Sequence, residues 1–337
     1  MASSMRRWQT PAFGRQHLQL ADVPVPAPGP RDVLVRVDAV ALNYRDLLIL
    51  RDGMGMAAPF PLVPGSDMSG EVVATGADVT DFAPGDAVIS TFFTGWQDGR
   101  QPPGSMALGV PGPGVLSEYI VLGEVSLVTA PRTLNAARAS TLTCAGLTAW
   151  YALAEASNTR PGDTVVVIGT GGVALFAVQI AHAQGARVIV VSGSDEKLAR
   201  AKQLGADDGV NRTHTPQWAD EVRALTGGRG ADHVLELAGE HNFGRSLTSL
   251  TQGGRVSVIG NLGGDELTTS VYPLLRGRAT VQGIGVGHRR ALEDLVRAVD
   301  WLKLSPVIER EYPFEALPAA LDHLERGAFG KVVVQVR

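Results

Sequence analysis

The feature that most constrains the fold is the segment 165–174, which reads Val-Val-Val-Ile-Gly-Thr-Gly-Gly-Val-Ala. Its four β-branched apolar residues predict a strand that is buried on both faces. A glycine turn follows, and apolar residues at helical spacing continue over 175–181. Gly169, Gly171 and Ala174 match G-x-G-x-x-G/A in the strand–turn–helix setting that is typical of dinucleotide binding, where the amides of the helix N-terminus receive a pyrophosphate. The alternative is an ordinary glycine turn.

Size and composition limit the classes of function. A length of 337 residues is enough for two domains, and a formal net charge of −4 does not favour nucleic acid or an anionic membrane as a partner. Cys144 is the only cysteine, which excludes an intramolecular disulfide and a structural zinc lobe with several cysteines. No apolar run approaches the roughly 20 residues of a membrane span, and no secretory signal is evident. We therefore expect a cytoplasmic protein.

Strands alternate with helices in the segment that contains the glycine turn. After the first strand, further strands are expected at 185–191, 208–211, 231–237, 254–259 and 279–286. Such alternation predicts an α/β domain with a doubly wound parallel sheet of the Rossmann type, in which ligands bind at the carboxyl ends of the strands. We therefore expect Gly239, Gly260 and Asn261 to face the cofactor. His233 lies inside a strand and is expected to be a half-buried structural residue.

The end of the second parallel strand bears on which dinucleotide is bound. NAD selection uses a carboxylate about 20 residues beyond the glycines, and this chain has no acid at that position. Hydroxyls and cations that suit a 2′-phosphate are present instead, at Ser192, Ser194, Lys197 and Arg212. The alternative role for Ser194 is the N-cap of the next helix. The carboxylates of Asp195 and Glu196 mildly favour NAD, but they are expected to lie in the first turn of that helix, where negative charge suits the helix dipole. We expect NADP(H) in preference to NAD(H).

The N-terminal part of the chain, 8–124, has short apolar strands broken by proline and glycine. The strands are expected at 33–40, 70–75, 87–89 and 117–121, and 332–334 adds one more. Several short strands at close spacing predict a small antiparallel barrel. The expected domains are 1–126 with 289–337 for the barrel and substrate, and 127–288 for the dinucleotide.

Four stretches, 41–46, 64–73, 144–150 and 329–334, resemble the medium-chain dehydrogenase/reductase superfamily and occur in the expected order. Within it the chain is most similar to the zinc-free quinone oxidoreductase-like branch, which is often labelled zinc-type alcohol dehydrogenase-like. The resemblance implies a GroES-like barrel and a homodimer formed through the edge strand 279–286. The residues expected at the cofactor are Gly169, Thr170, Gly171, Gly172, Val173, Ser192, Ser194, Lys197, Arg212, Gly239, Gly260, Asn261, Gly285 and Lys331.

The resemblance also bears on zinc. Zinc-dependent members carry Gly-His-Glu where this chain has Gly-Ser66-Asp67, and a cysteine ligand near the position of Asn43. Cys144 lies where some of them have a third ligand. One thiolate and one carboxylate without an imidazole make a poor zinc site, so we expect a protein without a metal.

The residues expected at the chemistry are Asn43, Tyr44 and Asp46, on the loop after the first long strand, and Thr148, which the resemblance places near the nicotinamide. Tyr44 can donate a phenolic proton. The alternatives are that the Tyr44 ring packs against its neighbours and that Asn43 caps backbone groups. Asp46 would then be a structural acceptor that pairs with Arg45 or Arg51.

Three aromatic residues on one loop, Phe92, Phe93 and Trp96, are candidates for the roof of an apolar substrate pocket. A buried plug or a subunit contact are the alternatives. The following stretch, 97–114, is rich in proline and glycine and is long for a connector, which favours a lid.

Together these features predict a zinc-free, NAD(P)H-dependent oxidoreductase that transfers hydride to an activated carbonyl acceptor, a quinone or an α,β-unsaturated carbonyl. The alternative within the enzymes is an NAD(P)-dependent alcohol/ketone dehydrogenase. The alternative from another class is a non-catalytic NADPH-binding sensor or structural protein.

Overall fold

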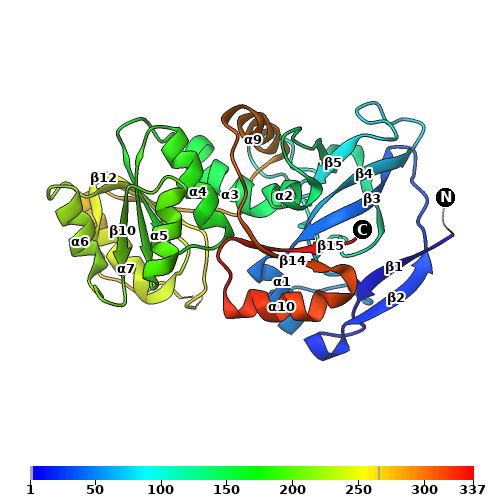
Figure 1. Ribbon diagram of the computed structural model, residues 1–337, viewed down its shortest axis with the longest axis horizontal. Coiled ribbons are helices and arrows are strands. Elements are labelled where there is room, and N and C mark those ends of the chain that lie inside the picture. The colour runs from blue at the N-terminus through cyan, green and yellow to red at the C-terminus, as the bar shows by residue number, and fades with distance from the viewer. Residues whose placement is uncertain (1–2, 265) are drawn as a thin grey trace. The chain divides into compact units, whose positions relative to one another are not determined.

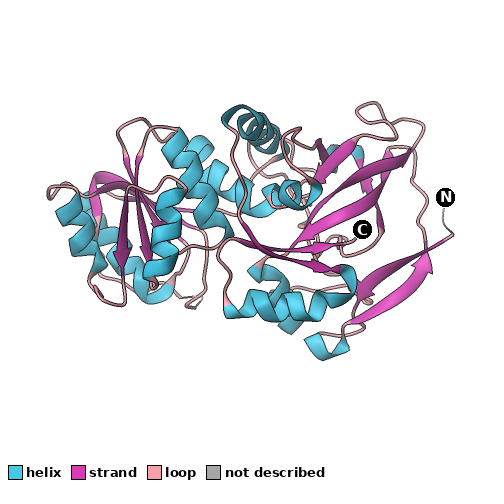
Figure 2. Ribbon diagram, viewed as in Figure 1, coloured by secondary structure: helices cyan, strands magenta, loops and turns pink. Residues whose placement is uncertain are grey.

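The computed structural model describes residues 3–264 and 266–337, which form two compact units (Figure 1). The first unit joins Met1–Leu147 to Gly287–Arg337, and the second is Thr148–Val286. A largely antiparallel sheet lies in the first unit and a parallel sheet in the second (Figure 2). The α/β fold class expected from the sequence is therefore confirmed.

The first unit is built on a seven-stranded sheet in the order β14-β15-β3-β4-β5-β7, with β6 paired to β3. Its strands are β3 (Asp32–Ala41), β4 (Asp67–Thr75), β5 (Ala87–Ser90), β6 (Tyr119–Gly123), β7 (Leu127–Thr129), β14 (Ile308–Pro313) and β15 (Lys331–Gln335). Alternate residues of β3, Val33, Val35 and Val37, point into the main core of this unit. Only β14 and β15 are parallel among these pairs, because a helix connects them along the chain.

The first unit extends past residue 126, where the sequence pattern placed the domain boundary. Strand β7 pairs with β5, with Leu127 opposite Ser90 and Val128 opposite Ile89. Backbone pairing therefore keeps this segment in the first sheet, and the unit ends at Leu147.

Helices and a hairpin complete the first unit. Its helices are α1 (Tyr44–Asp52), α2 (Ala136–Ser140), the π-helical turn η4 (Leu142–Gly146), α9 (Arg289–Leu302) and α10 (Leu317–Arg326). Strands β1 (Ser4–Gln9) and β2 (Gln19–Pro24) form a separate two-stranded sheet. Helix α9 begins at Arg289, because the His288 ring caps it by accepting the N–H of Ala291 at 3.0 Å.

The second unit contains a six-stranded parallel sheet in the order β10-β9-β8-β11-β12-β13. Its strands are β8 (Thr164–Ile168), β9 (Arg187–Ser192), β10 (Asp208–Asn211), β11 (Ala231–Glu236), β12 (Leu250–Val258) and β13 (Thr280–Gly283). Every residue of β8 is buried, as the run of β-branched residues predicts. The last strand, β13, lies at the edge of the sheet, also as predicted.

Helices lie on both sides of this sheet (Figure 2). They are α3 (Leu147–Trp150), the π-helical turn η5 (Tyr151–Ala156), α4 (Gly172–Ala183), α5 (Asp195–Gln203), α6 (Trp218–Leu225), α7 (Phe243–Thr248) and α8 (Tyr272–Gly277). Val166 and Ile168 of β8 share one core cluster with Trp218 of α6 and Phe243 of α7. Residues two apart along a strand share a face, so α6 and α7 pack on the face of the sheet to which these two side chains point.

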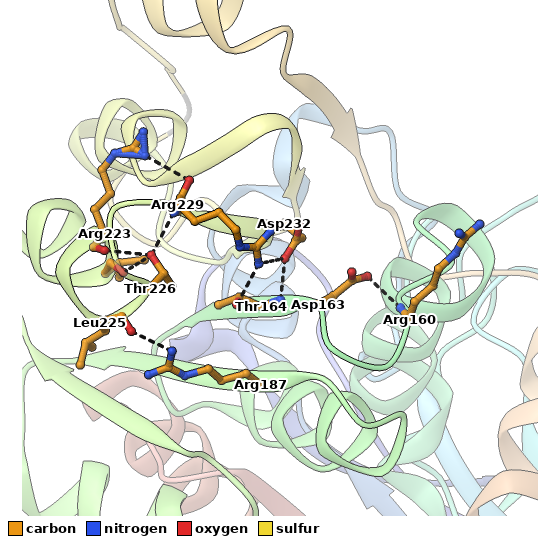
Figure 3. A network of polar contacts seen from close by, with 11 residues as sticks. Arg160, Asp163, Thr164, Arg187, Arg223, Leu225, Thr226, Arg229 and Asp232 are labelled. Atoms are coloured by element: carbon orange, nitrogen blue, oxygen red, sulfur yellow. Dashed lines mark hydrogen bonds and ion pairs between the residues drawn. The ribbon is translucent and has the colours of Figure 1, made fainter.

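The amino ends of the parallel strands are held by a charged network (Figure 3). Asp232, on β11, accepts the backbone N–H of Thr164 on β8 at 2.7 Å and pairs with Arg229 at 2.5 Å. Arg187, on β9, donates to the carbonyl of Leu225 at 2.7 Å. These bonds stabilise the amino-terminal edge of the parallel sheet, opposite the edge that carries the glycine turn.

The histidine in β11 is more deeply buried than its sequence position predicts. His233 is fully buried, whereas the sequence predicted a half-buried residue, because β11 lies between two neighbouring strands. Its Nε2 lies 2.8 Å from Ser257 Oγ, and burial lowers its pKa to about 3, as expected for a structural histidine.

Among the helices of the described ranges, none has the length and hydropathy needed to cross a membrane.

Candidate functional site

The glycine turn lies at the carboxyl end of β8, in the setting that the motif requires. Gly169 has φ +93°, in the left-handed region, and its N–H donates to the carbonyl of Val191 at 2.7 Å. Gly171 is the N-cap of α4, and a Cβ built there would meet no atom within 4 Å. Open space therefore adjoins the first turn of α4, whose N–H groups have no partners within the helix. This arrangement fits the pyrophosphate of a dinucleotide.

The other residues expected at the cofactor in this unit share one edge of the sheet. Strands β8, β9, β11 and β12 are paired in register, so their carboxyl ends coincide. Each of the expected residues lies at or just beyond the end of a strand or in the helix that follows it. They are Ser192, Ser194, Lys197, Arg212, Gly239, Gly260, Asn261 and Gly285, with Thr170, Gly172 and Val173 in the turn after β8 and the start of α4.

In the turn after β9, Ser194 is a helix N-cap, and the Arg212 cation lies close by. Ser194 Oγ accepts the N–H of Lys197 at 3.3 Å, so it is the N-cap of α5. Asp195 lies in the first turn of this helix and accepts a hydrogen bond from Asn211 at 2.7 Å. The guanidinium of Arg212 lies beside the turn, 3.7 Å from the point where a Cβ of Gly193 would be. The Arg212 guanidinium and the Ser194 hydroxyl therefore both lie at the turn that follows β9.

A buried carboxylate that sequence reasoning missed shapes the turn after β11. Glu236 accepts the N–H groups of Ala238 at 2.8 Å and Gly239 at 3.0 Å, and it also accepts from the side chains of Asn242 and Ser246. Gly239 adopts φ +75° in this turn. The available signal was an acid at the end of an otherwise apolar strand, where burial requires hydrogen-bond partners.

In the first unit, Asn43, Tyr44 and Asp46 do not lie on a loop as predicted. Asn43 is the N-cap of α1, Tyr44 is the first residue of this helix, and Asp46 lies in its first turn. The helix begins this early because the Asp46 carboxylate accepts the backbone N–H of Asn43 at 2.8 Å. Tyr44 is 39% exposed, so part of its side chain is accessible to solvent.

Asp46 is a structural acceptor, as the alternative held, but neither neighbouring arginine is its hydrogen-bond partner. Arg45 donates to the carbonyls of Leu108 and Val110 at 3.0 and 2.5 Å, and Arg51 pairs with Asp52 at 2.9 Å. Burial raises the pKa of Asp46 to about 6. Its Oδ1 atom meets no hydrogen-bond donor within the described part of the chain.

A hydrogen-bond chain connects the start of α1 with β4, η4 and β15. Lys331 Nζ donates to Asn43 Oδ1 at 2.6 Å, and Asn43 Nδ2 lies 3.3 Å from Ser66 Oγ. Ser66 donates to Asp67 Oδ1 at 2.6 Å, and Asp67 Oδ2 accepts the backbone N–H of Cys144 at 3.2 Å. The residues that correspond to zinc ligands in the resemblance therefore bond to one another.

This donor set does not fit a zinc ion. Both oxygens of Asp67 are engaged by N–H and O–H donors, and an amide and a hydroxyl replace two of the usual ligands. Burial raises the pKa of the Cys144 thiol to about 12. Within residues 3–264 and 266–337, no group of three or more His, Cys, Asp and Glu side chains is arranged to hold a metal ion.

The three aromatic residues of the loop after β5 form one cluster. The ring centroids of Phe92 and Phe93 are 4.9 Å apart, and those of Phe93 and Trp96 are 5.8 Å apart, both edge to face. Phe92 and Trp96 are buried, as in a plug, while Phe93 is half-buried. The loop is tied to α9, because Arg289 N–H donates to the Trp96 carbonyl at 3.0 Å. A role for these rings at a substrate stays a prediction.

The two remaining predicted site residues are Thr148 and Lys331. Thr148 is buried in α3 of the second unit. Lys331 begins β15 in the first unit, is only 4% exposed, and also donates to the carbonyl of Leu42 at 2.5 Å. Its expected contact with the cofactor stays a prediction, and its observed partners are backbone and Asn43.

Family models match most of the chain. Residues 29–132 match the alcohol dehydrogenase GroES-like domain, and residues 172–302 match the zinc-binding dehydrogenase domain. These ranges fall in the first unit and mainly in the second unit, respectively. The match agrees with the largely antiparallel sheet of the first unit and the parallel sheet of the second.

Individual proteins agree with these matches over the full length. A zinc-type alcohol dehydrogenase-like protein of Schizosaccharomyces pombe is 38% identical over 91% of this chain and 91% of its own. A crystal structure from Sinorhizobium meliloti 1021, titled as an alcohol dehydrogenase, is 56% identical, covers 99% of both chains and has a TM-score of 0.96. The structure of an NAD-dependent alcohol dehydrogenase is 38% identical, covers 99% of this chain and 100% of its own, and has a TM-score of 0.91. The chain is therefore an oxidoreductase of the medium-chain dehydrogenase/reductase superfamily.

Proposed function

We propose that this protein uses NADPH to reduce an activated carbonyl compound, a quinone or an α,β-unsaturated carbonyl, without zinc. The observation that carries the proposal is the chain of hydrogen bonds from Lys331 through Asn43 and Ser66 to Asp67. It occupies the positions that supply metal ligands in zinc-dependent relatives. A site without a Lewis acid favours acceptors that are already electrophilic over simple ketones.

The cofactor is proposed to lie at the carboxyl edge of the parallel sheet. When bound, the dinucleotide supplies the hydride. The first turn of α4 receives its pyrophosphate, and Gly171 allows the close approach because it lacks a Cβ. Arg212 and Lys197 are the cations proposed to bind a 2′-phosphate, together with the hydroxyl of Ser192.

Asn43 and Tyr44 are the proposed donors to the substrate oxygen. Negative charge develops on that oxygen as hydride reaches the carbon, and hydrogen-bond donors stabilise it. Asn43 donates through Nδ2, and the exposed Tyr44 hydroxyl can deliver a proton. Both residues stand at the N-terminus of α1, where the helix dipole also favours negative charge.

Two weaker relatives support the acceptor class. A quinone oxidoreductase of Sus scrofa is 27% identical, and an acryloyl-coenzyme A reductase of Sulfurisphaera tokodaii is 30% identical. The more similar proteins with alcohol dehydrogenase in their names favour alcohol/ketone interconversion as the second candidate.

Initial rates separate the two reactions. With NADPH, the purified protein should reduce 1,4-naphthoquinone or an enone, and with NADP⁺ it should oxidise a secondary alcohol at least ~100 times more slowly, a difference of about 2.7 kcal/mol in activation free energy. Metal analysis and incubation with EDTA accompany the assay. Faster alcohol oxidation, or activity that EDTA abolishes and zinc restores, contradicts the proposal. Binding of NADPH without turnover of any acceptor supports a sensor instead.

Titration calorimetry tests the choice of dinucleotide. We expect NADPH to bind more tightly than NADH, and Arg212→Ala to remove most of that difference while changing NADH affinity little. Arg310→Ala, at an exposed site in the first unit, is the matched control. A preference for NADH is the competing expectation, because one similar structure is that of an NAD-dependent alcohol dehydrogenase. Tighter binding of NADH than of NADPH would refute the proposal.

We also propose that the protein forms a homodimer through β13. This strand is at the sheet edge, so one side of its backbone is unpaired, and Val281 on it is exposed. Large apolar side chains are also exposed on and beside the neighbouring α8, namely Val271, Tyr272 and Leu275. Sedimentation velocity should give a dimer, and Val281→Lys should give a folded monomer. A monomeric wild-type protein would rule this out.

A further inference from the structure

The two ends of the Asn43 side-chain amide each contact a group with a single hydrogen-bonding role, a donor at one end and an acceptor at the other. Lys331 Nζ lies 2.6 Å from one end of the amide, and an ammonium group only donates, so this end must be the oxygen. Ser66 Oγ lies 3.3 Å from the other end. Ser66 donates its single hydrogen to Asp67 at 2.6 Å, so its oxygen can only accept from Asn43, and that end must be the nitrogen.

The chain therefore has a single direction, from an ammonium through an amide and a hydroxyl to a carboxylate. Lys331, Ser66 and Asp67 are buried and Asn43 is half-buried, so solvent has little access to these bonds. A cation that donates to an amide oxygen polarises the amide, and this makes its N–H groups stronger donors. The cation here also donates to the Leu42 carbonyl at 2.5 Å, which fixes its position.

We infer that Lys331 is a positioning residue for Asn43, and that its ammonium orients and polarises this amide so that Nδ2 faces its partners as a donor. This role differs from a contact between Lys331 and a cofactor phosphate. The effect on turnover rests on the proposed function, in which Asn43 stabilises charge on the substrate oxygen. The orientation of the amide does not depend on it.

The principal variant is Lys331→Met, which keeps the length of the side chain and removes its charge. The matched control is Lys202→Met on α5, the same substitution at an exposed lysine. Ser66→Ala removes the acceptor at the other end of the amide, so it tests the same chain without altering a charge. Thermal melting establishes that each variant is folded.

The first measurement needs no turnover. Protein labelled with ¹⁵N-asparagine gives one pair of side-chain signals that is lost in Asn43→Ala and so belongs to Asn43. We expect Lys331→Met and Ser66→Ala to move this pair, and Lys202→Met to leave it in place. An Asn43 pair that stays in place in a folded Lys331→Met protein overturns the inference.

The second measurement separates positioning from cofactor binding. With NADPH and 1,4-naphthoquinone, we expect Lys331→Met to lower kcat by roughly tenfold, because the Asn43 amide loses the charged hydrogen bond that orients and polarises it. The NADPH dissociation constant from calorimetry should change by less than about twofold, since each tenfold change requires about 1.4 kcal/mol. Ser66→Ala should lower kcat less, and the double variant should lose less than the product of the single losses.

Weakening of NADPH binding by about tenfold or more with kcat retained would assign Lys331 to the cofactor and refute positioning. If the wild-type protein turns over neither naphthoquinone nor an enone, the proposed function fails, and the asparagine signals still decide the role of Lys331. If Lys331→Met does not fold, the movement of the Asn43 pair and the loss of kcat in Ser66→Ala decide it.

Discussion

Asp67 accepts the backbone N–H of Cys144 at 3.2 Å, and this bond joins the start of β4 to the π-helical turn η4. A π-helical turn shifts the backbone hydrogen bonds by one residue, as in the bond from Gly146 N–H to the Thr141 carbonyl. The Asp67 carboxylate therefore gives a buried N–H group a partner. Two positions that the superfamily resemblance associates with metal ligands are here joined by a structural hydrogen bond.

Replacing Asp67 should destabilise the first unit. Asp67→Ala leaves the Cys144 N–H and the Ser66 hydroxyl without an acceptor, and it removes a buried carboxylate whose charge acts on Lys331, although the Asp46 carboxyl group remains. Because such unpaired buried groups are costly, we expect a loss of about 3 kcal/mol in the free energy of unfolding by urea denaturation. Asp78→Ala, at an exposed carboxylate, should change it by less than about 0.5 kcal/mol. Equal effects of the two substitutions would contradict this account.

Cys144 should be an unreactive thiol. Burial raises its pKa to about 12, so the thiolate fraction at pH 8 is far smaller than for a free cysteine with a pKa near 8.5. Labelling of the folded protein with Ellman's reagent at pH 8 should be at least ~100 times slower than labelling of free cysteine, and denaturant should restore the ordinary rate. Rapid labelling without denaturant would show that the thiol is not held in this environment.

Asp46 should make stability depend on pH. Its folded pKa of about 6 lies above the ordinary value of 3.8, so its contribution favours the folded state below about pH 4 and is lost as the pH rises through 6. Asp46→Asn cannot titrate but can still accept the Asn43 N–H. From pH 5 to pH 8, its free energy of unfolding should therefore rise relative to wild type by about 1.4 kcal/mol.

Urea denaturation of both proteins at the two pH values measures this difference. Asp220→Asn, at an exposed carboxylate on α6, is the control, and its difference from wild type should not change with pH. A constant difference between Asp46→Asn and wild type would mean that Asp46 is ionised without cost in the folded protein.

Gly171→Ala should separate binding from folding. The backbone of Gly171 is not left-handed and a Cβ there meets no protein atom, so the melting temperature should change little. A methyl group would occupy the space beside the first turn of α4 that we assign to the pyrophosphate, so calorimetry should show NADPH binding weakened by roughly tenfold or more. Gly277→Ala, which also meets no atom, should leave binding unchanged. Undiminished affinity in Gly171→Ala would place the pyrophosphate elsewhere.

Glu236→Ala should loosen the turn after β11. It removes the acceptor of the Ala238 and Gly239 N–H groups, so hydrogen exchange at these amides should accelerate by about tenfold or more while exchange within β8 is unchanged. Glu221→Ala, at an exposed position on α6, is the control. Slow exchange at both amides in a folded Glu236→Ala protein would show that other contacts hold the turn.

The sequence by itself determined the parallel sheet and the position of the glycine turn. The run at 165–168 is buried on both faces, and the glycines follow it directly, so local pattern and local structure agree. The N-cap role of Ser194 is also local, because the hydroxyl bonds an N–H three residues ahead. Even the early start of α1 had a local signal in the spacing of Asn43 and Asp46, although the sequence reading took it for a loop.

Only the tertiary structure decided what the polar residues of the first unit do. Lys331 and Asn43 are 288 positions apart in the chain, and Asp67 and Cys144 are 77 apart, so no spacing rule connects them. Their bonds exist because β15 pairs beside β3, and η4 packs against β4. A buried polar group takes the partner that the fold brings to it, and that partner is fixed by strand order and packing.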